Sequence, residues 1–194
     1  MRDRQGRGVA RIWTIGHSTR PVAELIELVR ANGVALLVDI RRYPGSRRQP
    51  QYGREALGSA LRAAGIEYLH EPELGGRRSP GPDSPNRHWR DRGFRGYADY
   101  MGTPEFGAAL ARLVELATER PTAILCAEAV PWRCHRQLVA DALVAGGHDV
   151  AHITGPGRTA AHVLNAAARR RPDGVLEYPS ESEQGRLFDG GDDG

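Results

Sequence analysis

The chain has 194 residues, of which 27 are basic and 24 acidic, and its formal net charge is +3. This length predicts one domain, and the presence of two cysteines excludes a disulfide scaffold and favours a reducing cytoplasm. Every basic residue is arginine, which excludes the Schiff-base and P-loop chemistry that depends on lysine. Since no apolar run approaches the roughly 18 residues of a membrane span, we expect a cytoplasmic protein.

Five short segments are typical of strands, and one of them, 34–38, is the continuous apolar run expected of a strand buried on both faces. They cover residues 12–15, 34–38, 66–69, 122–125 and 149–153. The segments between these runs place apolar residues at helical spacing, with proline at helix starts and glycine at helix ends. These segments predict helices over 21–31, 57–64, 104–117, 133–145 and 160–168.

This alternation predicts a doubly wound α/β fold with a mainly parallel five-stranded sheet, a Rossmann-like or flavodoxin-like three-layer sandwich. We expect residues 1–171 to form this single domain. Residues 172–194 carry seven acids against one arginine and few apolar residues, which predicts an acidic, mostly disordered tail. Within the domain, 71–93 lacks a regular pattern, and an irregular segment of this length is usually functional.

Polar residues follow the predicted strands at the end where parallel sheets bind their ligands. Three strand ends and the start of the helix at 133 carry Gly16-His17-Ser18, Asp39-Ile40-Arg41-Arg42, Cys126-Ala127-Glu128 and Arg133-Cys134-His135-Arg136. Right-handed crossovers bring the carboxyl ends of parallel strands to one edge of the sheet. We therefore expect one shared cleft that contains His17, Asp39, Cys126, Glu128 and His135.

These motifs also carry a resemblance to a known family. The relevant stretches include Thr14-Ile15-Gly16-His17-Ser18, Val38-Asp39-Ile40-Arg41, Phe94-Arg95-Gly96-Tyr97, Cys126-Ala127-Glu128 and Cys134-His135-Arg136. In this order they resemble the bacterial family catalogued as domain of unknown function 488, over about 13–153. The resemblance implies one α/β domain and a site, and it implies no particular reaction.

Cys126 is the candidate nucleophile. A thiol at a strand end that faces a helix start and several arginines has its thiolate stabilised, which makes it a better nucleophile. Six residues separate Cys126 from Arg133, whereas cysteine phosphatases and sulfurtransferases leave five and line the loop with glycine. Here the loop contains the acid Glu128, which would face a phosphate, so phosphatase chemistry is disfavoured. The alternative is that Cys126 is a small buried hydrophobic residue.

Glu128 and Asp39 are the candidate acid/base carboxylates, with salt bridges to nearby arginines as the alternative. His17 is the candidate ligand-facing imidazole, and the alternative is a hydrogen-bonded structural histidine. We expect no metal, because neighbouring Cys134 and His135 would point about 100° apart on a helix. We also expect no cofactor.

Arginines near the predicted cleft indicate an anionic ligand. Arg133 and Arg136 in the first turn of a helix would form an anion cradle. Ser18, Arg41, Arg42, Cys134 and His135 would extend the binding surface. Among the tryptophans, Trp89 is the best candidate for stacking on a base.

These features predict an enzyme that acts on a phosphate-bearing ligand, a nucleotide or nucleic acid, with a link to DNA repair or modification. Hydrolysis, group transfer and base modification remain open, and the alternative is a non-catalytic adaptor that binds nucleic acid or protein. In the tail, Gln184, Leu187 and Phe188 are similar to the short peptide by which bacterial repair and replication proteins attach to the DNA sliding clamp. Two adjacent exposed apolar residues could anchor in such a partner's groove.

Overall fold

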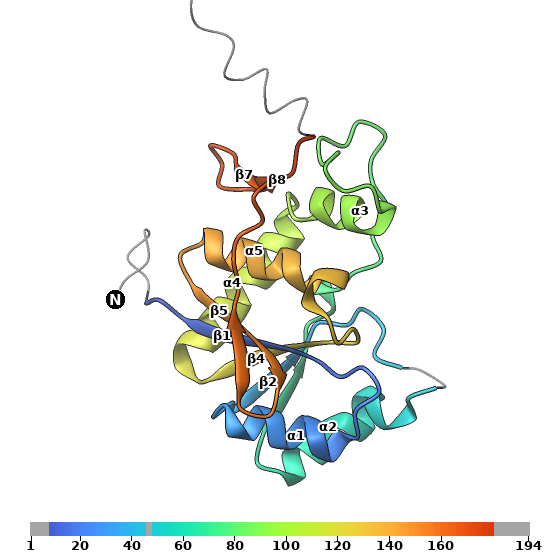
Figure 1. Cartoon of the computed structure of the whole chain (residues 1–194), viewed down its shortest axis with the longest axis vertical. Coiled ribbons are helices and arrows are strands. Elements are labelled where there is room, and N and C mark those ends of the chain that lie inside the picture. The colour runs from blue at the N-terminus through green and yellow to red at the C-terminus, as the bar shows by residue number, and fades with distance from the viewer. Residues whose placement is uncertain (1–7, 46–47, 181–194) are drawn as a thin grey trace, which may run out of the picture.

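A computed structural model describes residues 8–45 and 48–180. In this part of the chain, a central sheet separates two layers of helices, with α1 and α2 below it in Figure 1 and α4 and α5 above it. The tail residues Gln184, Leu187 and Phe188 lie outside the described residues. None of the helices in the described ranges has both the length and the apolar character that crossing a membrane requires.

From β1 to β5 strands and helices alternate as predicted, except that two helices, α3 and α4, lie between β3 and β4, and the first of them was not predicted. The strands are β1 (Arg11–Gly16), β2 (Leu36–Asp39), β3 (Glu67–His70), β4 (Thr122–Cys126), β5 (Asp149–Gly155) and β6 (Arg158–Ala161), with a small hairpin of β7 (Arg169–Arg170) and β8 (Leu176–Glu177). The helices are α1 (Val22–Ala31), α2 (Arg54–Ala63), α3 (Arg92–Tyr100), α4 (Pro104–Glu119) and α5 (Arg136–Ala145). Three short 3₁₀ helices connect them: η1 (Pro50–Tyr52), η2 (Pro72–Leu74) and η3 (Pro131–Arg133).

The central sheet has six strands in the order β3-β2-β4-β1-β5-β6, and all neighbours are parallel except β5 and β6. The predicted sheet of five strands was therefore one strand short. The order also differs from the 3-2-1-4-5-6 of Rossmann folds and the 2-1-3-4-5 of flavodoxin. Here β4 lies between β1 and β2, which places the end of β4 between two other polar strand ends.

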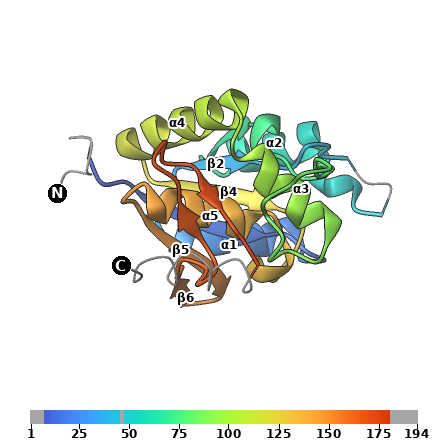
Figure 2. The same ribbon diagram turned by 90° about the horizontal axis from the view of Figure 1, so that it is seen from above.

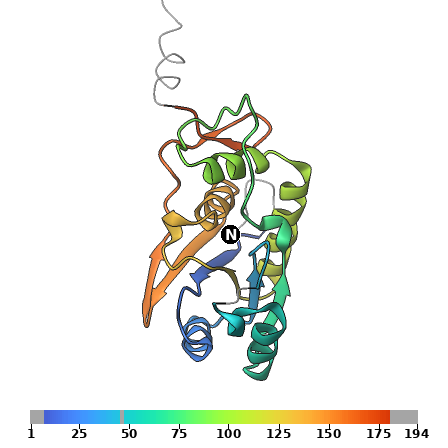
Figure 3. The same ribbon diagram turned by 90° about the vertical axis from the view of Figure 1, so that its right-hand side faces the viewer.

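Two apolar cores hold the three layers together, one on each face of the sheet. Figure 3 shows the helices on the two sides of the sheet. Side chains alternate between the faces of a strand, so Leu37 of β2 packs with Leu25 and Leu57 under α1 and α2. Its neighbour Val38 packs on the other face with Leu113 of α4 and residues of α5. Helices thus cover both faces of the sheet, as a three-layer α/β fold requires.

The prediction of a helix over 160–168 is wrong. A two-residue turn at Pro156-Gly157 sends the chain back along β5 as the antiparallel edge strand β6 (Figure 2). Gly157 has a φ of +62°, a conformation that glycine adopts without steric cost. The alanines at 160 and 161 favour a helix by intrinsic propensity, but the pairing with β5 overrides it.

The chain from 172 to 180, which composition assigns to the tail, packs against the domain. Tyr178 is fully buried, and its hydroxyl donates to the carboxylate of Asp141 over 2.9 Å. Its backbone N–H donates to Asn86, which ties this stretch to the irregular segment 71–93. That segment is itself ordered around Asp99, whose carboxylate accepts from Ser84, Asn86 and the N–H of residue 81.

Candidate functional site

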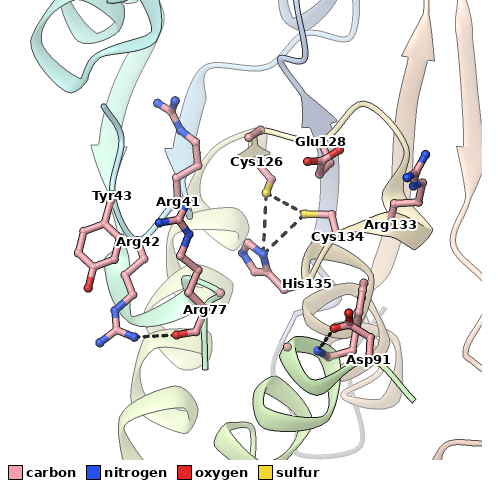
Figure 4. Close-up of a pocket in the computed structure, with 14 residues that line it drawn as sticks. Arg41, Arg42, Tyr43, Arg77, Asp91, Cys126, Glu128, Arg133, Cys134 and His135 are labelled. Carbon is pink, nitrogen blue, oxygen red and sulfur yellow. Dashed lines mark hydrogen bonds between the residues drawn. The ribbon is translucent and has the colours of Figure 1, made fainter. Parts of the chain in front are cut away.

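A cavity of about 300 Å³ opens at the carboxyl end of the sheet, at the lower limit for small-molecule sites. It is bounded by the ends of β2 and β4, the chain before α5, and the irregular segment (Figure 4). Its lining consists of Arg41, Arg42, Tyr43, Gly76, Arg77, Asp91, Gly93, Phe94, Cys126, Ala127, Glu128, Arg133, Cys134 and His135.

The loop after β4 is held closely against the loop after β1. The backbone N–H of His17 donates to Cys126 O over 3.0 Å, and that of Ser18 donates to Ala127 O over 2.8 Å. A side chain at position 16 would not fit, because a Cβ on Gly16 would lie only 1.7 Å from the carbonyl oxygen of Glu128. Glycine in the Gly16-His17-Ser18 motif therefore lets the Cys126 loop cross over β1.

Two thiols lie in contact at the base of the cavity. Cys126 and Cys134 are each 4% exposed, and the Cys134 thiol donates to Cys126 Sγ over 2.7 Å. Nδ1 of His135 lies 3.9 Å from Cys126 Sγ and 3.6 Å from Cys134 Sγ, as Figure 4 shows. This triangle brings together three of the residues that the sequence analysis selected.

The contact between the thiols shifts their pKa values in opposite directions. The hydrogen bond from Cys134 holds the pKa of Cys126 well below its ordinary value, with help from His135 and Arg136 and against the effect of burial. The same contact, together with burial, raises the pKa of Cys134 well above its ordinary value. The arrangement therefore favours a Cys126 thiolate that accepts from a Cys134 thiol, and reactive cysteines are of this ionised kind.

A buried arginine lies beside the thiols. Arg136 is 1% exposed, and Nη2 donates to Ala129 O over 3.2 Å. Its Nε and Nη1 have no hydrogen-bond partner, and no carboxylate of the described residues forms an ion pair with it. Buried charges in proteins are normally paired. Burial lowers the pKa of Arg136, and the nearby Cys134, Cys126 and Glu128 act in the opposite direction, which favours the cation.

His135 is fixed in place by its neighbours. Its ring packs against that of Tyr97 with centroids 5.0 Å apart. A Cβ on Gly76 would lie 2.7 Å from Nδ1, so glycine is needed for the irregular segment to approach the imidazole this closely. Nε2 is buried and has no partner among the described residues. Among the described residues, the ring therefore has polar contacts with the two sulfurs alone, through Nδ1.

Asp39 and His17 come to the same end of the sheet but do not line the cavity. Asp39 is fully buried, and both carboxylate oxygens accept from Arg41, at 2.8 Å from Nε and 2.6 Å from Nη2, while Tyr68 also donates to Oδ2. His17 stacks on Tyr52, and its Nε2 accepts from Arg41 Nη1 over 3.2 Å. Burial lowers the pKa of His17. Both residues thus orient Arg41, which does reach the cavity.

Glu128 is exposed and lines the cavity with Arg42, Arg77 and Arg133. Arg42 Nη1 donates to the carbonyl oxygen of Arg77 over 3.1 Å (Figure 4). Arg77 has a φ of +61°, which residues with a side chain rarely adopt. Trp89 was the candidate predicted within the segment 71–93, whereas Gly76, Arg77 and Asp91 line the cavity and were not predicted as site residues; Asp91 also caps α3.

The predicted anion cradle is only half correct. Arg133 ends η3 and faces the cavity, but α5 begins at Arg136, whose side chain is buried beside the thiols. Pro131 starts the short 3₁₀ turn, and Cys134 then takes an extended conformation, with φ of −141°, before the helix. Trp89 is also no base-stacking platform, because it packs against Phe94 and Tyr178.

The extended conformation of Cys134 removes the argument against a metal, which assumed that Cys134 and His135 lie on a helix. Cys134 and His135 precede α5, so their side chains are not splayed around a helix, and with Cys126 they offer three ligand atoms within 4.8 Å of one another. Tetrahedral zinc places sulfur and nitrogen ligands about 3.5 Å apart and two sulfurs about 3.8 Å apart. The two S···N distances fit this geometry, whereas the sulfurs, at 2.7 Å, would have to separate by about 1 Å.

Comparison with known proteins gives a family and no function. No curated protein and no solved structure was found to match the chain. The family model described as Domain of unknown function DUF488 matches residues 21–143, which is more than half of the chain and includes the cavity residues from β2 to the start of α5. The chain therefore belongs to the DUF488 family.

Proposed function

We propose that this protein is an enzyme that acts on a phosphate-bearing ligand, a nucleotide or nucleic acid, with Cys126 as its nucleophile. One observation carries the proposal: Arg136 is a buried cation without a carboxylate partner among the described residues, its backbone N–H donates to Cys134 Sγ, and its charge helps to lower the pKa of the Cys126 thiol that lines the cavity. A neutral cysteine that only fills space in the core is not stabilised by a buried positive charge, whereas a thiolate is.

Arginines at the mouth of the cavity set the ligand class. Arg42, Arg77 and Arg133 line it and have no carboxylate partner among the described residues, and a planar guanidinium matches phosphate oxygens. Arg41 is neutralised by Asp39, so its role is to shape the wall. The ligand would thus place its phosphate among these arginines and its electrophilic atom over Cys126.

Glu128 is the acid/base group of the proposal. The Cys126 thiolate forms a bond to the electrophilic atom, and the bond to the leaving group breaks with its electron pair. Glu128, as the carboxylic acid, protonates that leaving group. The resulting carboxylate then removes a proton from water or from a second substrate, which displaces Cys126 as thiolate. Hydrolysis or group transfer follows, according to which nucleophile enters.

The proposal is tested by protection of Cys126 from alkylation. The reduced full chain is treated with iodoacetamide beside nucleoside mono- and triphosphates and short single-stranded and duplex DNA, and Cys126 labelling is read by mass spectrometry. We expect at least one probe to protect Cys126, and Arg133→Gln to weaken that protection by about tenfold, the loss of one charge-assisted contact. Arg120→Gln is the matched control, since Arg120 precedes β4 at the opposite end of the strand and pairs with Glu67.

Turnover separates an enzyme from the alternative, a non-catalytic adaptor that uses the same cleft. The burial of Cys126 to 4% exposure favours the adaptor, because few reagents reach so enclosed a thiol. With the probe that protects best, product formation is followed for wild type, Cys126→Ser and Glu128→Gln. Conversion that both variants abolish supports the enzyme, and unchanged probe in all three supports the adaptor.

A place in the cytoplasm and a role in DNA repair or modification complete the proposal. They rest on the arginine-lined cavity and on Gln184, Leu187 and Phe188, which would bind the DNA sliding clamp. A peptide of residues 180–194 is titrated against the purified clamp, with a variant in which Leu187 and Phe188 are alanine. Binding of the first peptide alone supports the clamp as partner, and equal binding of the two peptides argues against it.

A further inference from the structure

The nucleophile role leaves the second cysteine unexplained. Cys134 is the only other cysteine of the chain, it lines the same cavity, and its sulfur lies 2.7 Å from that of Cys126. A disulfide bond is about 2.05 Å long, so the sulfurs need to approach by only about 0.7 Å. Cys134 is a loop residue with an extended backbone between η3 and α5. A shift of its sulfur by this distance leaves α5 in place.

We propose that Cys126 and Cys134 form a reversible dithiol–disulfide couple that a small hydroperoxide oxidises through the cavity. Formation of the disulfide is independent of the function proposed above. Its consequence, the loss of the Cys126 nucleophile, rests on that function. Oxidation would therefore switch the enzyme off, and reduction would restore it.

The chemistry proceeds in two steps. Cys126 Sγ attacks one oxygen of hydrogen peroxide, the O–O bond breaks, and the other oxygen leaves as hydroxide and becomes water after taking a proton. The product is Cys126 sulfenic acid. Cys134, as thiolate after losing its proton, then attacks the sulfenic sulfur, the S–O bond breaks, and the released hydroxide takes that proton to give a second water. Two thiols and one peroxide thus yield one disulfide and two waters.

The surroundings favour a reversible couple over a permanent disulfide. In the reduced state a Cys126 thiolate favours the buried charge of Arg136 through space, and Nε and Nη1 of Arg136 have no hydrogen-bond partner among the described residues. Oxidation removes that anion and leaves the cation buried without compensation, which costs free energy. A disulfide stabilised less than its dithiol has a higher reduction potential and is more easily reduced. Arg136 therefore shifts the equilibrium between the dithiol and the disulfide toward the dithiol.

The experiment uses the reduced full chain and hydrogen peroxide near one equivalent, followed by intact mass and peptide mapping. We expect wild type to lose two hydrogens, to show a Cys126–Cys134 cross-link, and to regain both thiols with a dithiol reductant. In Cys134→Ser we expect oxygen addition at Cys126, trapped by a sulfenic-acid reagent, and no cross-link. Cys126→Ser should remain unoxidised under the same conditions.

Three results would overturn the proposal. The first is oxygen addition to wild-type Cys126 without a cross-link, and the second is a cross-link between two chains. The third is a zinc ion bound as purified that keeps both sulfurs from peroxide, which metal analysis detects. An Arg136→Met variant adds a readout of potential: its disulfide should need a stronger reductant than that of wild type, and an equal or higher potential would contradict the charge argument.

Because no substrate enters these measurements, they succeed or fail independently of the proposed function. A disulfide that forms while no probe protects Cys126 leaves the couple standing and removes the enzyme. A protected Cys126 that never forms the disulfide does the reverse. Where turnover is found, loss of activity in the oxidised chain and its recovery on reduction tests the switch itself.

Discussion

The pH dependence of Cys126 alkylation tests the thiolate most directly. The Cys134 hydrogen bond, and after it His135 and Arg136, hold the pKa of Cys126 well below its ordinary value, so we expect the sulfur to be ionised near neutral pH. The thiolate is the nucleophile, so its alkylation rate should change little with pH. Replacement of Arg136 by methionine removes one of the groups that lower this pKa, and the profile should then rise more steeply with pH than that of wild type.

The expected contrast is large. An ordinary thiol with a pKa of about 8.5 gains about 75-fold in its thiolate form between pH 6 and pH 8, and its rate rises by the same factor. A thiol ionised throughout this range changes by less than about threefold. The Cys134 hydrogen bond is the largest cause of the lowered pKa and Arg136 a smaller one, so the rate for Arg136→Met should rise by more than that of wild type and by less than about 75-fold over the same interval.

The assay is iodoacetamide labelling of the reduced full chain, with each cysteine quantified separately by peptide mass spectrometry. Cys134 is an internal comparison, since its raised pKa predicts slow labelling that increases steeply with pH. Arg133→Met is the matched control, because Arg133 is exposed and its loss should leave the Cys126 profile flat. A roughly 75-fold rise for Cys126 in the wild-type chain would refute the thiolate and the reading of Arg136 as its counter-ion.

Three further predictions concern stability and binding. Burial lowers the pKa of His152 from 6.5 to about 4, so the unfolded chain binds a proton at a higher pH than the folded chain. The free energy of unfolding should therefore fall by about 2 kcal/mol from pH 7 to pH 5. Urea titrations of wild type measure this loss, which His152→Gln should lack. Tyr178→Phe removes the hydrogen bond to buried Asp141 and should cost about 1.5–3 kcal/mol in the same titration. If DNA binds, affinity should fall with salt, and Arg133→Gln should reduce the slope of log K against log salt by about one; an unchanged slope would place Arg133 away from the phosphates.

Much of the secondary structure could be predicted from the sequence because it follows from local patterns. Buried parallel strands are continuous apolar runs, and the fully buried strands β2 and β4 lie where such runs occur. Thr103 and Pro104 mark the start of α4 by capping and by a preset φ, both properties of single residues. The position of Cys126 at a strand end was predictable for the same reason, since β4 is one such run.

The composition of the site was predictable only in part, because polar side chains choose partners that are distant in the sequence. Asp39 was a candidate acid until its pairing with Arg41 and Tyr68 was visible. The contact between Cys126 and Cys134 depends on one extended residue before α5, which helical spacing does not reveal.

The sequence by itself determined where β1 to β5 and the helices α1, α2, α4 and α5 lie, and that its chemistry-bearing residues follow strand ends. The tertiary structure decided which of them meet. It placed β4 between β1 and β2, folded the segment 71–93 over the thiols, and buried Arg136 without a carboxylate. The physical reason is that apolar periodicity is set by burial within each element, whereas strand order and the pairing of buried charges are set by contacts between elements, which no local pattern encodes.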